Sequence, residues 1–142
     1  MKNLYKIFVS YSLLLIALSG CELSFETVEI YDERDRFTGY YEVEEYSEGS
    51  SATFYYNLNI WKSSRRDGII WIGNFYDCDI TVFAEVGADR FYIPVQRTGN
   101  LEIEGRGTLY AGDELSISYS VREIQPGPDY VDFLNCRAWK HY

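Results

Sequence analysis

Carboxylates are the most numerous side chains in this sequence whose chemistry could serve catalysis. The densest group is Glu42, Glu44, Glu45 and Glu48, and paired carboxylates are the usual equipment of acid–base hydrolysis. The surrounding residues do not indicate a desolvated pocket, which such a pair needs to separate its pKa values. We therefore interpret this group as the solvated face of a strand.

Histidine and metal chemistry find even less support. The single histidine, His141, stands one residue from the C-terminus, where chains are often poorly ordered, so a His-based triad is not predicted. Asp77 and Asp79 flank Cys78 but lack the spacing of a calcium loop, and the cysteines lack that of a zinc site. The sequence predicts no enzyme, no metal and no cofactor.

Aromatic residues make up 18% of the chain, with 14 tyrosines among them. The candidates for partner contact are Tyr55, Trp61, Trp71, Phe75 and Tyr92, because they fall on the nominally outward faces of the expected strands. Neighbouring strands would bring Trp61 and Trp71 close together. Two interpretations stay open: a second layer of core, which strands commonly build from aromatics, or an exposed patch for a protein or glycan partner.

The N-terminus has the layout of a cleaved signal peptide. Lys2 and Lys6 precede an apolar run from Ile7 to Leu18, and small residues follow. A helix over that run would span roughly 18 Å, too short for the ~30 Å core of a bilayer. The sequence therefore predicts secretion and not a transmembrane anchor.

Leu18-Ser19-Gly20-Cys21 resembles the lipobox of bacterial lipoproteins. The resemblance implies cleavage before Cys21, a diacylglycerol thioether on its sulfur, and an acyl chain such as palmitate on its amine. Two or three acyl chains hold a protein stably on a membrane. Glu22 follows the cysteine, and a residue other than Asp there favours the outer membrane, with the face left open.

Lipidation of Cys21 would leave Cys78 and Cys136 as a pair in an oxidising compartment. A disulfide between them would close a loop of nearly 60 residues and contribute about 4 kcal/mol in the chain-entropy description. We expect this disulfide. The alternative is two free thiols that pack as small hydrophobes.

The chain is strongly acidic. Its formal charge is −9, and loss of Lys2 and Lys6 with the leader leaves 11 basic residues against 22 acidic ones, a charge of −11. Such a field repels nucleic acid and anionic lipid headgroups. We therefore expect no nucleic-acid partner.

The predicted organisation is a leader (1–20), a lipidated tether (21–36) and one all-β domain (37–142). Period-two alternation between turn signals indicates about eight antiparallel strands and no ordinary helix. The expected strands are 37–46, 52–62, 69–75, 80–86, 90–96, 101–110, 115–121 and 130–139. This regular spacing predicts a meander that forms a barrel or a sandwich.

Three positions within these strands predict local irregularity. Pro94 cannot donate to a ladder and marks an edge, a bulge or a strand end. Gly105 and Gly107 fall on an inward face, where a bend is needed or a large side chain lies over bare backbone.

Phe37-Thr38-Gly39-Tyr40-Tyr41, Gly105-Arg106-Gly107-Thr108-Leu109 and Leu115-Ser116-Ile117-Ser118-Tyr119 resemble segments of small lipocalin-like lipoproteins. The resemblance implies a barrel or sandwich. We expect a non-enzymatic binding or structural module of the cell envelope, held on the membrane by its lipid, with a protein or glycan partner. The alternative is a lipocalin-like carrier of a small apolar ligand, which requires an internal cavity of a few hundred Å³.

Overall fold

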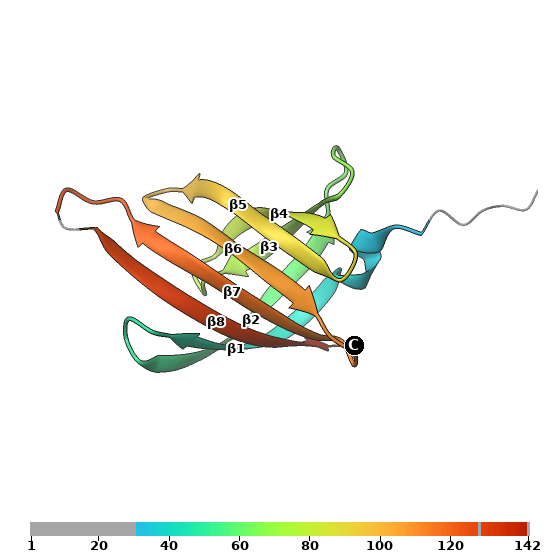
Figure 1. The fold of residues 1–142 in the computed structure, drawn as a ribbon, viewed down its shortest axis with the longest axis horizontal. Helices are drawn as coiled ribbons and strands as arrows, with labels where there is room; N and C mark the ends of the chain where they lie inside the picture. The colour runs from blue at the N-terminus through green and yellow to red at the C-terminus, as the bar shows by residue number, and fades with distance from the viewer. Residues whose placement is uncertain (1–30, 128, 142) are drawn as a thin grey trace, which may run out of the picture. The chain divides into compact units, whose positions relative to one another are not determined.

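The protein is an eight-stranded antiparallel β-barrel, seen in a computed structural model that describes residues 31–127 and 129–141 (Figure 1). Each strand pairs with the next along the chain, and β8 pairs with β1 from Tyr40–His141 to Ser47–Leu134, which closes the barrel. The elements are η1 (Glu33–Arg36), β1 (Gly39–Ser47), β2 (Ala52–Lys62), β3 (Ile69–Phe75), β4 (Ile80–Gly87), β5 (Arg90–Thr98), β6 (Leu101–Leu109), β7 (Glu114–Glu123) and β8 (Tyr130–His141).

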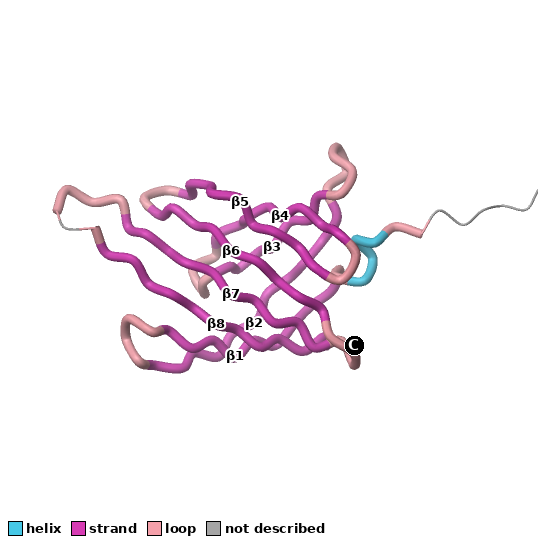
Figure 2. The backbone as a smooth tube through the Cα atoms, viewed as in Figure 1, coloured by secondary structure: helices cyan, strands magenta, loops and turns pink. Residues whose placement is uncertain are grey.

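The predicted all-β fold class is confirmed. Of the two predicted architectures, a barrel and a sandwich, the structure is the barrel (Figure 2). Alternation is the reason that the strand positions were predictable. On β7, for example, Leu115, Ile117, Tyr119 and Val121 are buried, and the residues between them face outward. Among the described residues, no helix is long and apolar enough to cross a membrane.

The two inward glycines of β6 lie where neighbouring atoms come too close for a Cβ, and Gly107 lies under a large side chain, as predicted. A Cβ at Gly107 would collide with the ring of Phe91, and one at Gly105 would collide with Tyr119. Gly107 therefore lets the Phe91 ring lie directly over bare backbone, whereas Gly105 lets the backbone of β7 approach closely at Ser118 and Tyr119.

Pro94 lies at a bulge, one of the three outcomes predicted for it. The register between β5 and β6 shifts between Ile93 and Gln96, and the paired residues of β4 and β5 run from Gly87–Arg90 to Glu85–Tyr92. Beyond this point the Gln96 side chain makes hydrogen bonds to the β4 backbone in place of backbone pairing between β4 and β5. Its amide oxygen accepts from the Phe83 N–H at 3.0 Å, and its amide nitrogen donates to the Phe83 carbonyl at 2.8 Å.

One end of the barrel is capped by η1, a segment predicted to be part of the tether. Glu33 accepts a hydrogen bond from the Ala88 N–H at 2.8 Å, and Arg34 donates to the carbonyls of Ser63 and Arg66. Phe37 then enters the interior and meets Phe91 edge-on, with ring centroids 5.6 Å apart. Residues 33–36 of the predicted tether therefore pack against the folded barrel. The leader and Cys21 lie outside the described residues.

Candidate functional site

The barrel interior is filled by side chains. Large apolar residues from all eight strands are fully or almost fully buried. They include Tyr41, Leu58, Ile60, Ile70, Ile72, Phe75, Val82, Phe91, Ile93, Ile103, Leu115, Ile117 and Leu134. The three hollows described below lie on the outer wall of the barrel.

A buried polar cluster lies within this apolar interior. Glu45 is 2% exposed, and its Oε2 accepts hydrogen bonds from the Tyr56 hydroxyl at 2.6 Å, from the Tyr119 hydroxyl and from the Cys136 thiol at 3.2 Å. Burial raises the pKa values of Tyr56, Tyr119 and Cys136 well above their ordinary range. All three groups therefore stay protonated and donate to one carboxylate. Because the cluster is sealed from solvent, we interpret it as a structural network.

The carboxylates of the first strand thus divide between two environments. Glu42, Glu44 and Glu48 are exposed, as predicted for a solvated face, but Glu45 faces the interior. The alternation of β1 could have predicted that Glu45 faces inward, since Glu45 lies two residues after the buried Val43.

The expected disulfide is absent. Cys78 is exposed in the loop between β3 and β4, whereas Cys136 is buried on β8, opposite Glu45, and both are free thiols. The physical reason is that the alternation of β8 turns Cys136 into the barrel, while Cys78 lies on a loop outside the ladder. The alternative of free thiols holds for both cysteines, with only Cys136 packed as a hydrophobe.

The five aromatic candidates do not form one site. Trp61 and Trp71 are direct cross-strand partners, as predicted. Trp71 meets Phe83 edge-on at 6.0 Å, the Arg66 guanidinium lies over Trp71 and Phe83, and the ring of Trp61 covers Gly73. This row is partly covered and is itself part of the packing of the outer wall.

Phe75 is 1% exposed and lies in the core, so its prediction as an outward contact is wrong. The register between β3 and β4 shifts between Gly73 and Phe75, and Asn74, between them, has a φ of 55°. An extra residue in a strand inverts the alternation that follows it. Phe75 is thereby turned to the same side as Ile72.

The remaining two candidates each line a hollow on the outer wall. Tyr55 lines one of about 410 Å³ on β1, β2 and β8, together with Glu42, Glu44, Asn57 and Trp139.

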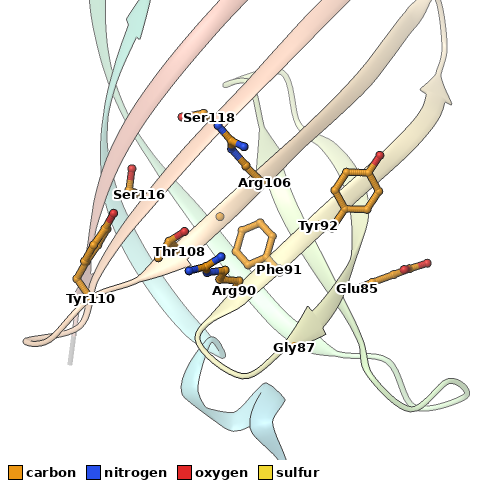
Figure 3. Close-up of a pocket in the computed structure, with 11 residues that line it drawn as sticks. Glu85, Gly87, Arg90, Phe91, Tyr92, Arg106, Thr108, Tyr110, Ser116 and Ser118 are labelled. Atoms are coloured by element: carbon orange, nitrogen blue, oxygen red, sulfur yellow. The ribbon is translucent and has the colours of Figure 1, made fainter.

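Tyr92 lines a larger hollow of about 580 Å³ on β5, β6 and β7 (Figure 3). Sheet register explains the arrangement. Arg90 pairs with Thr108 and Tyr92 pairs with Arg106 across β5 and β6, and these continue to Ser116 and Ser118 on β7. Long side chains therefore stand beside a row of short hydroxyls, and the difference in length makes the hollow.

The hollow continues along the wall toward β8. An adjoining hollow of about 640 Å³ shares Tyr92, Arg106 and Ser118 with the first. It adds Ser120 and Asn135, and Phe133, which is 55% exposed. We call the two hollows together the outer groove.

The outer groove is lined by two arginines, Arg90 and Arg106, and by three glutamates, Glu48, Glu85 and Glu104. Arg90 is exposed and lies 3.6 Å from the adjacent Asp89, and Arg106 makes no ion pair with any residue that the structure describes. Glu85 sits on β4 opposite Tyr92 and lines the same hollow as the two arginines (Figure 3). The groove therefore presents two guanidinium groups, whose planar forks match the oxygens of anionic groups.

Metal binding has no support in the described part of the chain, where no three His, Cys, Asp or Glu side chains come together as ligands. His141 is exposed and lies 3.6 Å from Glu42. Neither a scan against models of protein families nor a search of curated proteins finds a match for this chain.

Proposed function

We propose that the chain is a lipid-anchored module of the cell envelope that binds a protein or glycan partner through its outer groove, without catalysis. The observation that carries this proposal is the contrast between a filled interior and a hollowed outer wall. A carrier needs a cavity for its ligand, but large side chains occupy the interior of this barrel. The groove offers aromatic, cationic and hydroxyl groups along one continuous face.

Anchoring agrees with this role. The lipobox-like Cys21 would hold the barrel at a membrane surface, with the residues that follow it as a spacer. A fixed position raises the effective concentration of the module near envelope partners. Modest affinity in the groove would then suffice for function.

The test is a binding assay with the full-length protein in zwitterionic nanodiscs and delipidated envelope material. We expect saturable binding that is lost in the groove variant Tyr92→Ala/Arg106→Ala. The matched control is Tyr55→Ala/Trp139→Ala, which alters the other hollow and should leave binding unchanged.

Two outcomes would overturn the proposal. One is envelope binding that the groove variant leaves intact. The other is stoichiometric uptake of an apolar fluorescent ligand by the wild-type barrel, which would indicate a carrier with an interior that opens.

A further inference from the structure

We propose that the ligand of the outer groove is an acidic oligosaccharide, a short run of sugar rings with a sparse negative charge from carboxylate or phosphate groups. This inference rests on the proposed function and names the class of partner that the groove accepts. It is argued from four features of the groove: its cations, its hydroxyl row, its aromatic flanks and its length.

The two arginines of the groove favour a ligand that carries a negative charge. Arg90 and Arg106 are diagonal neighbours on β5 and β6, since Arg90 pairs with Thr108 and Arg106 with Tyr92. Asp89, the acidic partner of Arg90, is itself exposed, and such a surface pair is weak. Arginine presents a planar fork that matches carboxylate and phosphate oxygens. Two forks on one face therefore favour a ligand with such a group.

The hydroxyl row calls for a ligand rich in donors and acceptors. Ser116, Ser118 and Ser120 follow one another along the outward face of β7, and Thr108 stands beside Ser116. A serine or threonine hydroxyl both donates and accepts. Sugar hydroxyls have the same double capacity, whereas an extended peptide offers groups of this kind only from its backbone.

The aromatic side chains at the sides of the groove favour a ligand with flat, weakly polar faces. Tyr92 and Tyr110 are 51% and 57% exposed, on either side of the first hollow, and Phe133 continues the series in the second. Exposed aromatic rings supply contact area at low entropic cost. The C–H faces of sugar rings can lie against them while the hydroxyls reach the serines.

The length and the surroundings set the charge density. The groove crosses β5 to β8, which suits a chain of several rings. Glu85, Glu104 and Glu48 also line the groove, and the whole chain carries a formal charge of −9. A dense polyanion such as DNA, with one charge per ~1.7 Å, meets repulsion everywhere except at the arginines. A glycan with one charge per ring or fewer can place its anion there.

The experiment is a calorimetric titration of the full-length protein with a hexuronate tetramer. Its matched probes are the carboxyl-reduced neutral tetramer, a phosphate-bearing oligosaccharide of the same length, and tetraglutamate. We expect the hexuronate or the phosphate probe to bind at least roughly 10-fold more tightly than the neutral tetramer, as charge-assisted hydrogen bonds imply. Whichever of these two binds better identifies the source of the anion.

Variants connect the binding to the groove. Arg106→Ala should weaken binding of the acidic probe by roughly 10-fold or more and remove most of its salt dependence. Glu104→Gln should tighten the same binding. Arg65→Ala is the matched control, because Arg65 is exposed on the loop between β2 and β3, outside the groove.

Failure of this inference differs from failure of the proposed function. Equal binding of the acidic and neutral tetramers, tighter binding of tetraglutamate, or no binding of any probe overturns the acidic oligosaccharide. The proposed function still stands in each case if the groove variant abolishes envelope binding. Among these measurements, the one that would overturn the proposed function is envelope binding that the groove variant leaves intact.

Discussion

Glu45 is the residue whose loss we expect to cost the barrel most for its size. Replacing it by Ala would leave the hydroxyls of Tyr56 and Tyr119 and the Cys136 thiol without their shared acceptor. An unsatisfied buried polar group costs about 1–3 kcal/mol. We therefore expect Glu45→Ala to lower the free energy of unfolding by about 2–4 kcal/mol, measured by urea denaturation.

Glu44→Ala supplies the control for this prediction, because Glu44 lies next along β1 but faces solvent. Its effect should stay within about 0.5 kcal/mol. Similar losses in the two variants would mean that the buried hydrogen bonds contribute nothing beyond the loss of side-chain volume and charge.

Cys136 makes a prediction about alkaline pH. Burial raises the pKa of its thiol, so the folded chain keeps a proton that the unfolded chain releases above about pH 8.5. The folded state then binds more protons, and stability must fall as pH rises above that value, by up to roughly 1 kcal/mol per pH unit. Well below pH 8.5 the contribution of this thiol to stability is fully present.

Replacing Cys136 by Ser should flatten this slope between pH 8.5 and 10, measured by urea denaturation at several pH values. Cys78→Ser should change the slope less, because Cys78 is exposed. Alkylation of the native protein should likewise modify Cys78 and spare Cys136. A slope unchanged in Cys136→Ser would show that its thiol ionises equally in both states.

At the scale of elements, the packing of β5 against β6 depends on a glycine, Gly107, which has no side chain. The ring of Phe91 fills the space that a Cβ at Gly107 would need. Gly107→Ala should therefore force Phe91 to move and cost about 1–3 kcal/mol, the usual cost of overpacking. Thermal or urea unfolding would measure it.

Gly87 is the matched control for this substitution. A Cβ there meets nothing within 4 Å, and its φ is not in the left-handed region. Gly87→Ala should be close to neutral. Equal destabilisation at both positions would attribute the effect to backbone conformation and not to the contact with Phe91.

Elements also mark the limit of what the sequence could predict. Alternation placed the strands and the faces of β7 because a period of two reports burial directly. It failed at Phe75, where one extra residue inverts the phase. Alternation also did not predict η1, which is held by residues distant in sequence. It did not predict the hydrogen bonds from the Gln96 side chain to the Phe83 backbone either, because they take the place of backbone pairing between strands.

The outer groove shows the same limit at the site. Tyr92 was predicted as a contact residue, but Arg90, Arg106 and the serines of β7 were not. They come from three strands, and only the register of β5, β6 and β7 makes them neighbours. Outward charged and hydroxyl residues are typical of any solvated strand face, so their types alone carry no signal.

At the scale of the whole molecule, acidity and anchoring act against each other. The formal charge of −9, which loss of the predicted leader would change to −11, repels the anionic headgroups of a membrane, so we expect the barrel itself to have no affinity for such a surface. Acyl chains on Cys21 would have to supply all of the attachment, at about 0.8 kcal/mol for each buried CH₂. Membrane association should therefore depend on one atom, the Cys21 sulfur.

Cys21→Ser tests this directly in cells that are fed a labelled fatty acid. The wild-type chain should take up the label and float with membranes, whereas the variant should take up none and should stay unattached at low as well as high salt. Cys78→Ser serves as the control, since it removes a thiol outside the lipobox and should leave both labelling and flotation unchanged. If Cys21→Ser still carries label and floats, attachment must come from another part of the chain, and the proposal of a lipid-anchored module fails with it.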